Sequence, residues 1–285
     1  MSIADPALWG FASMFAWGVT DMMARYAAVH LGSAMVALTV QGMGVVPPLL
    51  LGISRYPPLD YLAAGDFIVL TFFCGFLFTS GYVVYYQGLL KGQVFIVSPL
   101  TSSWLVVTTI LGVIFLDEVV GPVNALLIGV VLLGIILTSA SGRDGTTASG
   151  YWYGITGMIA FGIAFTLWKP LVEDVGPYVT VASVRFISAI LLGSYLTATG
   201  AMRVSWSRHA TLLVASAAVV DSLGYVTFNL GIERAPISLI APVAASYPAV
   251  TLVLAWVLVK ERVRPLQMGG IVTVLGGVVA LSAVG

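Results

Sequence analysis

The sequence has little charge. Of its 285 residues only 8% are charged, 59% are hydrophobic, and the mean hydropathy is +1.04. Soluble proteins carry about 25% charged residues, so this composition excludes an ordinary soluble domain and indicates an integral membrane protein. The formal net charge is zero and there is no basic tract, which leaves a nucleic-acid partner without support.

Cysteine and the common catalytic motifs are also lacking. Cys74 is the single cysteine, so a disulfide within one chain is excluded. Neither His30 nor His209 lies near a metal-like partner, and the sequence has no glycine-rich phosphate loop and no nucleophile motif. We therefore expect no enzyme activity, no metal and no cofactor.

Long hydrophobic runs fill the chain instead. A transmembrane helix needs about 20 mostly apolar residues. Ten segments fit, at 7–26, 32–52, 65–90, 94–116, 120–141, 151–170, 178–199, 207–233, 236–259 and 264–284. The runs are too long and too uniformly apolar for β-barrel strands, so we predict an all-α polytopic membrane protein with ten transmembrane helices.

The second half of the chain repeats the first. A shift of 143 aligns 81–142 with 224–285, with 19 identities over 62 positions and no gap. This indicates an internal duplication, with a first five-helix repeat at 1–141, a polar linker at 142–150 and a second five-helix repeat at 151–285. Because five is odd, the second repeat enters the membrane inverted, as in many secondary transporters, and a site is expected between the repeats near the midplane.

Aromatic and amide side chains recur at equivalent places in the two repeats. On the third and eighth helices they are spaced one helical turn apart, so each pair shares a face. Phenol and carboxamide groups need protein or water partners inside a membrane, which favours a cavity wall. Interface anchoring, core packing and interhelical hydrogen bonds are the alternatives. The candidate residues for substrate binding on these helices and on the first and sixth are Trp17, Tyr82, Tyr86, Trp168, Tyr225 and Asn229.

Proline interrupts the fourth helix at Pro99 and the ninth at Pro242. Proline removes a backbone donor and bends a helix, so we predict a kink that shapes the binding pocket and acts as a hinge. The alternative is a kink that packing tolerates. The neighbouring candidates for substrate contact are Ser102, Trp104, Ser246 and Tyr247.

Two charges, Arg185 and Asp221, lie well inside apolar runs. Intramembrane ionisable groups usually pair or face a cavity. One interpretation is a buried ion pair between them, and the other is an Asp221 that carries a proton or contacts a substrate amine. By contrast, Glu118 and Glu261 follow the fourth and ninth helices, and we expect each to lie at the start of the next helix, where the helix dipole favours a carboxylate.

The repeated pieces Ser98-Pro99-Leu100 through Leu116-Asp117-Glu118 and Ala241-Pro242-Val243 through Val259-Lys260-Glu261 resemble the EamA-type branch of the drug/metabolite transporter superfamily. The resemblance covers the whole chain and extends to the aromatic amino-acid exporters of that superfamily. It implies alternating access, a cavity lined by helices 1, 3, 4, 6, 8 and 9, and export of small metabolites across the bacterial inner membrane.

The uncharged, aromatic candidates indicate a neutral or zwitterionic cargo, with amino acids as the leading class. A multidrug or lipophilic-cation exporter is an alternative, but it calls for an acidic residue deep in the first helix, and Asp21 is expected near the end of that helix. A non-transporting membrane scaffold is the other alternative.

Two indications of the orientation in the membrane disagree. If the termini are cytoplasmic, the inside loops hold only Arg55, Lys169 and Arg234, and the outside loops hold eight lysines and arginines. This count favours termini outside, whereas the family resemblance implies termini in the cytoplasm. We follow the family. The expected partners are the lipid bilayer and a small-molecule substrate, and a monomer can be complete because both repeats lie in one chain.

Overall fold

The computed structural model describes residues 4–52, 65–91, 97, 100–138, 148–200, 202, 206–259 and 264–284. Every regular element within these residues is an α-helix, which confirms the all-α class. The first half contributes α1 (Ala4–Leu31), α2 (Ser33–Met43), α3 (Val46–Leu51), α5 (Gly65–Lys91), α7 (Trp104–Phe115) and α8 (Pro122–Thr138). The second half contributes α9 (Ala148–Val175), α10 (Pro177–Ala198), α11 (Arg208–Ile232), α12 (Ile237–Ala244), α13 (Tyr247–Val259) and α14 (Pro265–Val284).

Six segments of the described residues are long and apolar enough to cross a membrane. They are Ala34–Leu51, Gly65–Tyr85, Tyr151–Val175, Pro177–Ala198, Arg208–Ile232 and Ile237–Leu258. The apolar runs of α7, α8 and α14 are shorter, and α1 is not among the six. The structure therefore shows a multi-pass membrane protein, and the number of ten spans stays a prediction.

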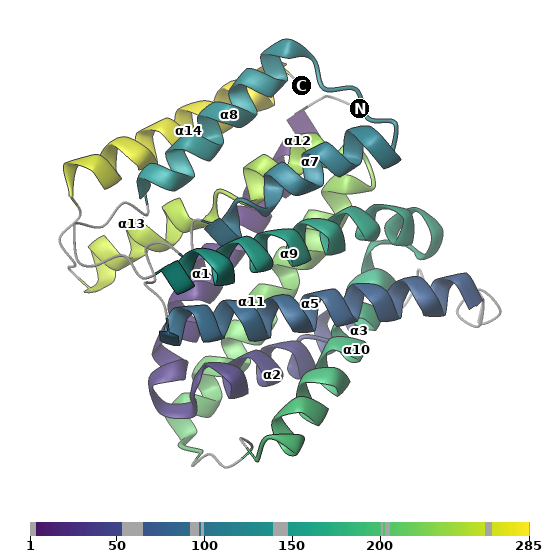
Figure 1. Ribbon diagram of the computed structural model, residues 1–285, viewed down its shortest axis with the longest axis vertical. Helices are drawn as coiled ribbons and strands as arrows, with labels where there is room; N and C mark the ends of the chain where they lie inside the picture. Colours follow the sequence, from purple (N-terminus) through teal and green to yellow (C-terminus); the bar gives the residue numbers. More distant parts are fainter. Residues whose placement is uncertain are drawn as a thin grey trace.

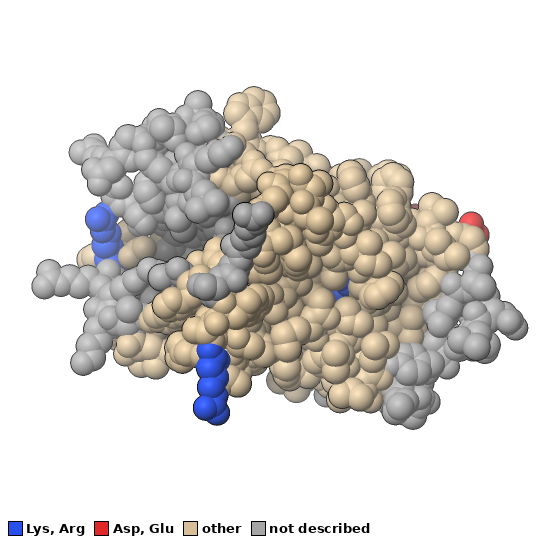
Figure 2. Space-filling model, turned by 90° about the horizontal axis from the view of Figure 1, so that it is seen from below, with Lys and Arg blue, Asp and Glu red and all other residues tan. Residues whose placement is uncertain are grey.

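The outer surface of the bundle is apolar. Figure 2 shows one face on which the described residues are almost all uncharged. Large hydrophobic side chains are exposed on the surface, including Phe115 at 71% exposure and Trp152 at 72%. An apolar surface this extensive is stable in lipid and not in water.

The halves pack in an equivalent way. The long helix α1 lies along α11, its counterpart α9 lies along α5, and α8 pairs with α14, as Figure 1 shows at the top of the view. Glycines permit the close approaches: a Cβ on Gly81 would lie 2.8 Å from the ring of Phe161, and one on its counterpart Gly224 would lie 2.7 Å from Trp17. The same contact thus occurs twice, at a register shift of 143 to 144 residues.

Glycine also makes the equivalent turns after the first helix of each half. Gly32 follows α1 with φ of 75°, and Gly176 follows α9 with φ of 84°. Only glycine adopts this left-handed region without strain. The next helix begins directly after each glycine, so the turn directs the chain back along the bundle.

Five predicted helices differ from the structure. The first, expected at 7–26, runs from Ala4 to Leu31, so Asp21 lies near its middle rather than near its end. The sixth, expected at 151–170, runs from Ala148 to Val175. The second, fourth and ninth are predicted as single helices. The second and ninth are divided into α2 and α3 and into α12 and α13, and the fourth is interrupted at Ser103, before α7. Of the predicted linker, residues 142–147 lie outside the described residues and α9 begins at Ala148, so the domain boundaries stay predictions.

The break in the second helix follows from two prolines. Pro47 and Pro48 have no N–H, so the carbonyls of Met43 and Gly44 lack their usual helical donors. The hydroxyl of Ser222 (α11) donates to the carbonyl of Gly44 at 2.6 Å and compensates one of them. The break is therefore stabilised from the other half of the chain.

Candidate functional site

Aromatic rings from both halves meet in the middle of the bundle. Trp17 (α1) lies at the centre, with ring centroids 4.9 Å from Tyr225 (α11) and 5.9 Å from Phe165 (α9). Further ring contacts bring in α5, α7 and α13. We call this group the aromatic cluster, and it comprises Trp17, Phe78, Tyr82, Trp104, Phe161, Phe165, Trp168, Tyr225, Phe228 and Tyr247.

Six predicted site residues lie in the aromatic cluster: Trp17, Tyr82, Trp104, Trp168, Tyr225 and Tyr247. In this conformation the rings contact one another. Trp104 stacks on Phe165 with centroids 4.2 Å apart, and Trp168 is 1% exposed. A cargo that bound here would therefore have to enter between the rings, and the role of these residues as cavity walls stays a prediction.

Two counterpart tyrosines bond to each other within the cluster. The hydroxyls of Tyr82 and Tyr225, 143 residues apart, lie 3.0 Å from each other. The contact joins equivalent positions of the two repeats, so it marks the place where the halves meet symmetrically.

The cluster also contains two indole donors without acceptors. Among the described residues, Nε1 of Trp17 and Nε1 of Trp168 are buried and have no hydrogen-bond partner. A buried donor of this kind is destabilising unless a ligand or water accepts its hydrogen bond. Both donors are therefore suited to an acceptor group of a bound molecule.

The fourth and ninth helices are each broken about one turn after the predicted proline. At each break an i to i−3 hydrogen bond closes the turn, from Ser103 N to Leu100 O at 3.2 Å and from Ser246 N to Val243 O at 3.2 Å. Pro242 itself lies inside α12, so a kink at the proline stays a prediction. Ser246 also donates its hydroxyl to the carbonyl of Pro242 at 2.7 Å. These two breaks are equivalent in the repeats. Pro99 and the side chain of Tyr86 lie outside the described residues.

Ser102 connects the first break to the aromatic cluster. Its hydroxyl donates to the phenol oxygen of Tyr247 at 3.0 Å. Asn229 is used differently: its buried amide nitrogen donates to the carbonyl of Pro177 at 3.1 Å, which joins α11 to the start of α10. Ser102 thus contacts the cluster, whereas the amide nitrogen of Asn229 is hydrogen-bonded to a backbone carbonyl of α10.

Arg185 (α10) and Asp221 (α11) form an ion pair between their Nη2 and Oδ2 atoms. Arg185 also donates through Nη1 to the carbonyl of Val40 at 2.9 Å, and its guanidinium lies 4.7 Å from the ring centroid of Tyr225. Both charges are buried, at 2% and 6% exposure. The pair therefore borders the aromatic cluster while presenting no net charge to it.

Sequence reasoning missed two residues around this pair. A Cβ on Gly44 would overlap Nη1 of Arg185, so the guanidinium occupies space that only glycine leaves free. Gln41, 2% exposed, extends its amide nitrogen to within 3.5 Å of the hydroxyl of Ser188. The run Pro47-Pro48 was the signal that α2 ends early, just before the buried Gly44.

Asp21 faces the inside of the bundle. The hydroxyl of Thr251 (α13) lies 3.5 Å from its Oδ2, and the same hydroxyl lies 3.3 Å from the carbonyl of Gly18. The residue is therefore a carboxylate in the middle of α1, which corrects the expected position near a helix end.

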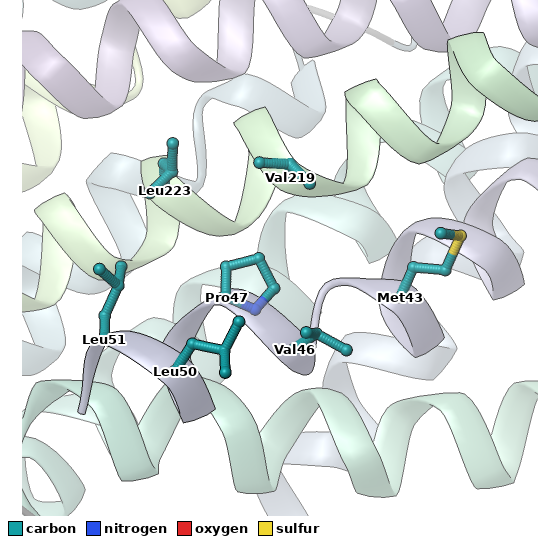
Figure 3. Close-up of a pocket in the computed structure, with 7 residues that line it drawn as sticks. All are labelled: Met43, Val46, Pro47, Leu50, Leu51, Val219 and Leu223. Atoms are coloured by element: carbon teal, nitrogen blue, oxygen red, sulfur yellow. The ribbon is translucent and has the colours of Figure 1, made fainter. Parts of the chain in front are cut away.

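A pocket of about 430 Å³ lies on the outer surface, away from the aromatic cluster. Figure 3 shows its lining, which is Met43, Val46, Pro47, Leu50, Leu51, Val219 and Leu223 from α2, α3 and α11. None of these side chains offers a polar group. The pocket is therefore unsuited to a polar cargo.

Comparison with known proteins identifies the family. The sequence profile of the EamA-like transporter family matches residues 6–140 and again residues 148–283. The chain belongs to the EamA-like transporter family. This EamA-like transporter is thus a membrane transporter made of two copies of the family unit, and the match does not select the aromatic amino-acid exporters within the superfamily.

The fold has a close structural relative. A crystal structure aligns with 98% of this EamA-like transporter and 96% of its own chain, with a TM-score of 0.82 and 15% sequence identity. At that identity the likeness shows the fold alone. No curated protein matches the sequence significantly.

Proposed function

We propose that this EamA-like transporter exports small neutral or zwitterionic metabolites, most specifically amino acids, by alternating access around the aromatic cluster. The observation that supports the proposal is the composition of the cluster: rings from α7 of the first half and from α9, α11 and α13 of the second half contact Trp17. Movement between the halves would open a path to these rings from one side and then from the other. We expect no catalytic activity.

Charge supports a neutral cargo rather than a phosphate-bearing one. Arg185, the cation beside the cluster, is neutralised by Asp221. Lys169 binds backbone carbonyls and lies 3.1 Å from Glu173. Neither cation is free to bind a phosphate, and recognition of sugar phosphates or nucleotides depends on such groups.

Topology completes the proposal. We propose ten spans in two inverted five-helix repeats, cytoplasmic termini and a place in the bacterial inner membrane; the duplicated contacts of α1 with α11 and of α9 with α5 support the two-repeat plan only. The two halves of one chain supply the whole cluster, so a monomer is the expected functional unit.

The test is flux in proteoliposomes. Purified protein is reconstituted and offered a panel of radiolabelled amino acids, with Trp104→Ala as the site variant. Trp104 is 3% exposed within the cluster, so removing its ring should lower flux at least tenfold. The matched control is Trp152→Ala, a tryptophan that is 72% exposed, which should retain the parent rate.

The proposal fails if no amino acid moves in the parent protein. The site assignment fails separately if Trp104→Ala transports every identified cargo at the parent rate.

A lipophilic-cation exporter is the second candidate, and the position of Asp21 favours it. This carboxylate lies midway along α1, on the inner side near Thr251 of α13, and aromatic faces nearby suit a cation. Adding a quaternary ammonium dye to the same panel distinguishes the two. Dye flux without amino-acid flux would select the cation exporter.

A further inference from the structure

Glu118 caps a helix of the other half. Its Oε1 accepts a hydrogen bond from the backbone nitrogen of Ile237 at 2.6 Å, and its Oε2 accepts one from Ser238 at 2.9 Å. These are the first two residues of α12, and Pro236 before them provides no side-chain acceptor. The sequence predicts Glu118 at the start of the following helix, and this is wrong: the carboxylate serves α12 and not α8.

The turn after α7 directs Glu118 to this place. Asp117 adopts a φ of 52°, and the amides of Leu116 and Glu118 both donate to the carbonyl of Gly112, at 3.0 and 3.2 Å. The chain thus folds back along α7. A Cβ on Gly112 would lie 3.0 Å from Oε2 of Glu118, so this glycine makes room for the carboxylate.

Lys169 (α9) binds the turn between α11 and α12, which leads into the helix that Glu118 caps. Its Nζ donates to the carbonyl of Ile232 at 2.5 Å and lies 3.5 Å from that of Ala235. Residues 233–236 connect α11 to α12, so an ammonium binds the end of one helix and a carboxylate binds the start of the next. Each charge lies at the helix end that the dipole favours.

The hydrogen bonds of Glu118 join the two halves, whereas those of Lys169 lie within the second half. Ile237 (α12) is fully buried, and a Cβ on Gly112 (α7) would lie 3.5 Å from its side chain. Glu118 itself is 9% exposed. The helices α7 and α12 belong to different halves and lie against each other in Figure 1.

We propose that Glu118 is a latch that holds α7 to the turn between α11 and α12, that Lys169 orders this turn from within the second half, and that this end of the bundle opens when Ile237 and Ser238 release Glu118. The proposal rests on the proposed transport function, since alternating access requires the halves to separate at one end. On release, water solvates both the carboxylate and the amides, so no charge stays buried. A carboxylate is therefore stable in the closed and in the open arrangement, as a latch requires.

The reporter for the latch is a thiol at its centre. Ser238 is 1% exposed, and its hydroxyl has no hydrogen-bond partner among the described residues, so Ser238→Cys leaves the described contacts intact. The native thiol is removed with Cys74→Ser. The rate at which a water-soluble methanethiosulfonate modifies the thiol of Ser238→Cys then measures how often this end opens.

Glu118→Gln in this background should raise the modification rate about tenfold, because it replaces two charge-assisted hydrogen bonds with neutral contacts. Lys169→Met should raise the modification rate about threefold, because it removes the ammonium that binds the carbonyl of Ile232 at the end of α11. The control is Glu173→Gln, which alters an exposed partner of Lys169 and should change the rate less than twofold.

Rates within twofold of the parent in both latch variants, with cooperative thermal unfolding retained, would overturn the latch. If Glu118→Gln does not fold, Lys169→Met decides alone. Flux through the same proteins separates this result from the proposed function. A faster modification rate with no flux in the parent supports the latch and rejects the transport proposal, whereas flux in the parent with unchanged rates rejects only the latch.

Discussion

Gln41 and Phe78 in the first half occupy the register positions of Arg185 and Asp221 in the second, at shifts of 144 and 143. One half thus has an amide and a ring where the other has an ion pair. The surrounding helices also differ: α2 ends at Met43, and α10 continues without a break to Ala198. Equivalent positions of the two halves thus differ in side-chain chemistry and in the continuity of the helix that carries them.

The difference teaches how a duplicated chain acquires an asymmetric interior. The cation of the second half donates to the carbonyl of Val40 beside the break of the first half. It also fills the space that Gly44 leaves. The halves therefore differ where a cation of one half fits a space in the other. Elsewhere their contacts are equivalent, as Gly81 against Phe161 and Gly224 against Trp17 show.

The largest expected effect comes from breaking the ion pair on one side. Asp221→Asn leaves Arg185 buried without its counter-charge, and this should lower the free energy of unfolding by about 3 to 5 kcal/mol. Arg185→Gln places the first-half residue at the equivalent position and should cost a similar amount. The double variant removes both charges and should recover most of the loss, measured by thermal unfolding in detergent. A double variant whose loss equals the sum of the single losses would contradict the coupling.

A smaller effect should follow from closing the space beside the pair. Gly44→Ala places a methyl group against the guanidinium of Arg185 and should destabilise by about 1 to 3 kcal/mol. The matched control is Gly42→Ala, where the nearest side-chain atom, on Ala189, is 4.0 Å away. The control should be neutral or gain up to about 1 kcal/mol from helix propensity. Equal melting temperatures of the two variants would show that Arg185 moves away freely.

The smallest effect concerns the tyrosine pair, where the two halves agree. Tyr82→Phe or Tyr225→Phe removes the hydrogen bond between the phenols and should cost about 0.5 to 1.5 kcal/mol. The double variant should lose little more than either single variant, because the bond is already absent. Thermal unfolding of the four proteins provides the measurement, and strictly additive losses would argue against a shared bond.

Much of the fold could be predicted because the signals are local or duplicated. Long apolar runs located the helices, and the repeat located equivalent residues such as Trp104 and Tyr247. Spacing of one helical turn put side chains on one face, so their convergence at Trp17 needed only correct packing.

The rest depends on contacts between distant segments. The partner of Glu118 is 119 residues away, and nothing in the local sequence distinguishes capping α12 from capping α8. The composition of 32–52 is that of a continuous helix apart from Pro47 and Pro48. The prediction of a single helix did not take these two prolines into account. The alternatives for Arg185 and Asp221 stayed open because a pair on two helices has no spacing rule.

The hydrogen bond between Tyr82 and Tyr225 differs in kind from every contact between non-equivalent residues. If the halves exchange conformations, a contact between non-equivalent residues is replaced by the contact between their counterparts in the other half. A contact between two counterparts, such as these tyrosines, joins the same two residues in both arrangements. Two hydroxyls can share only one bonding proton, so the exchange merely swaps donor for acceptor. If the halves exchange conformations, this bond is therefore a contact that both arrangements keep, although its surroundings are not symmetric, since Arg185 lies beside Tyr225 and the counterpart of Arg185 is the uncharged Gln41.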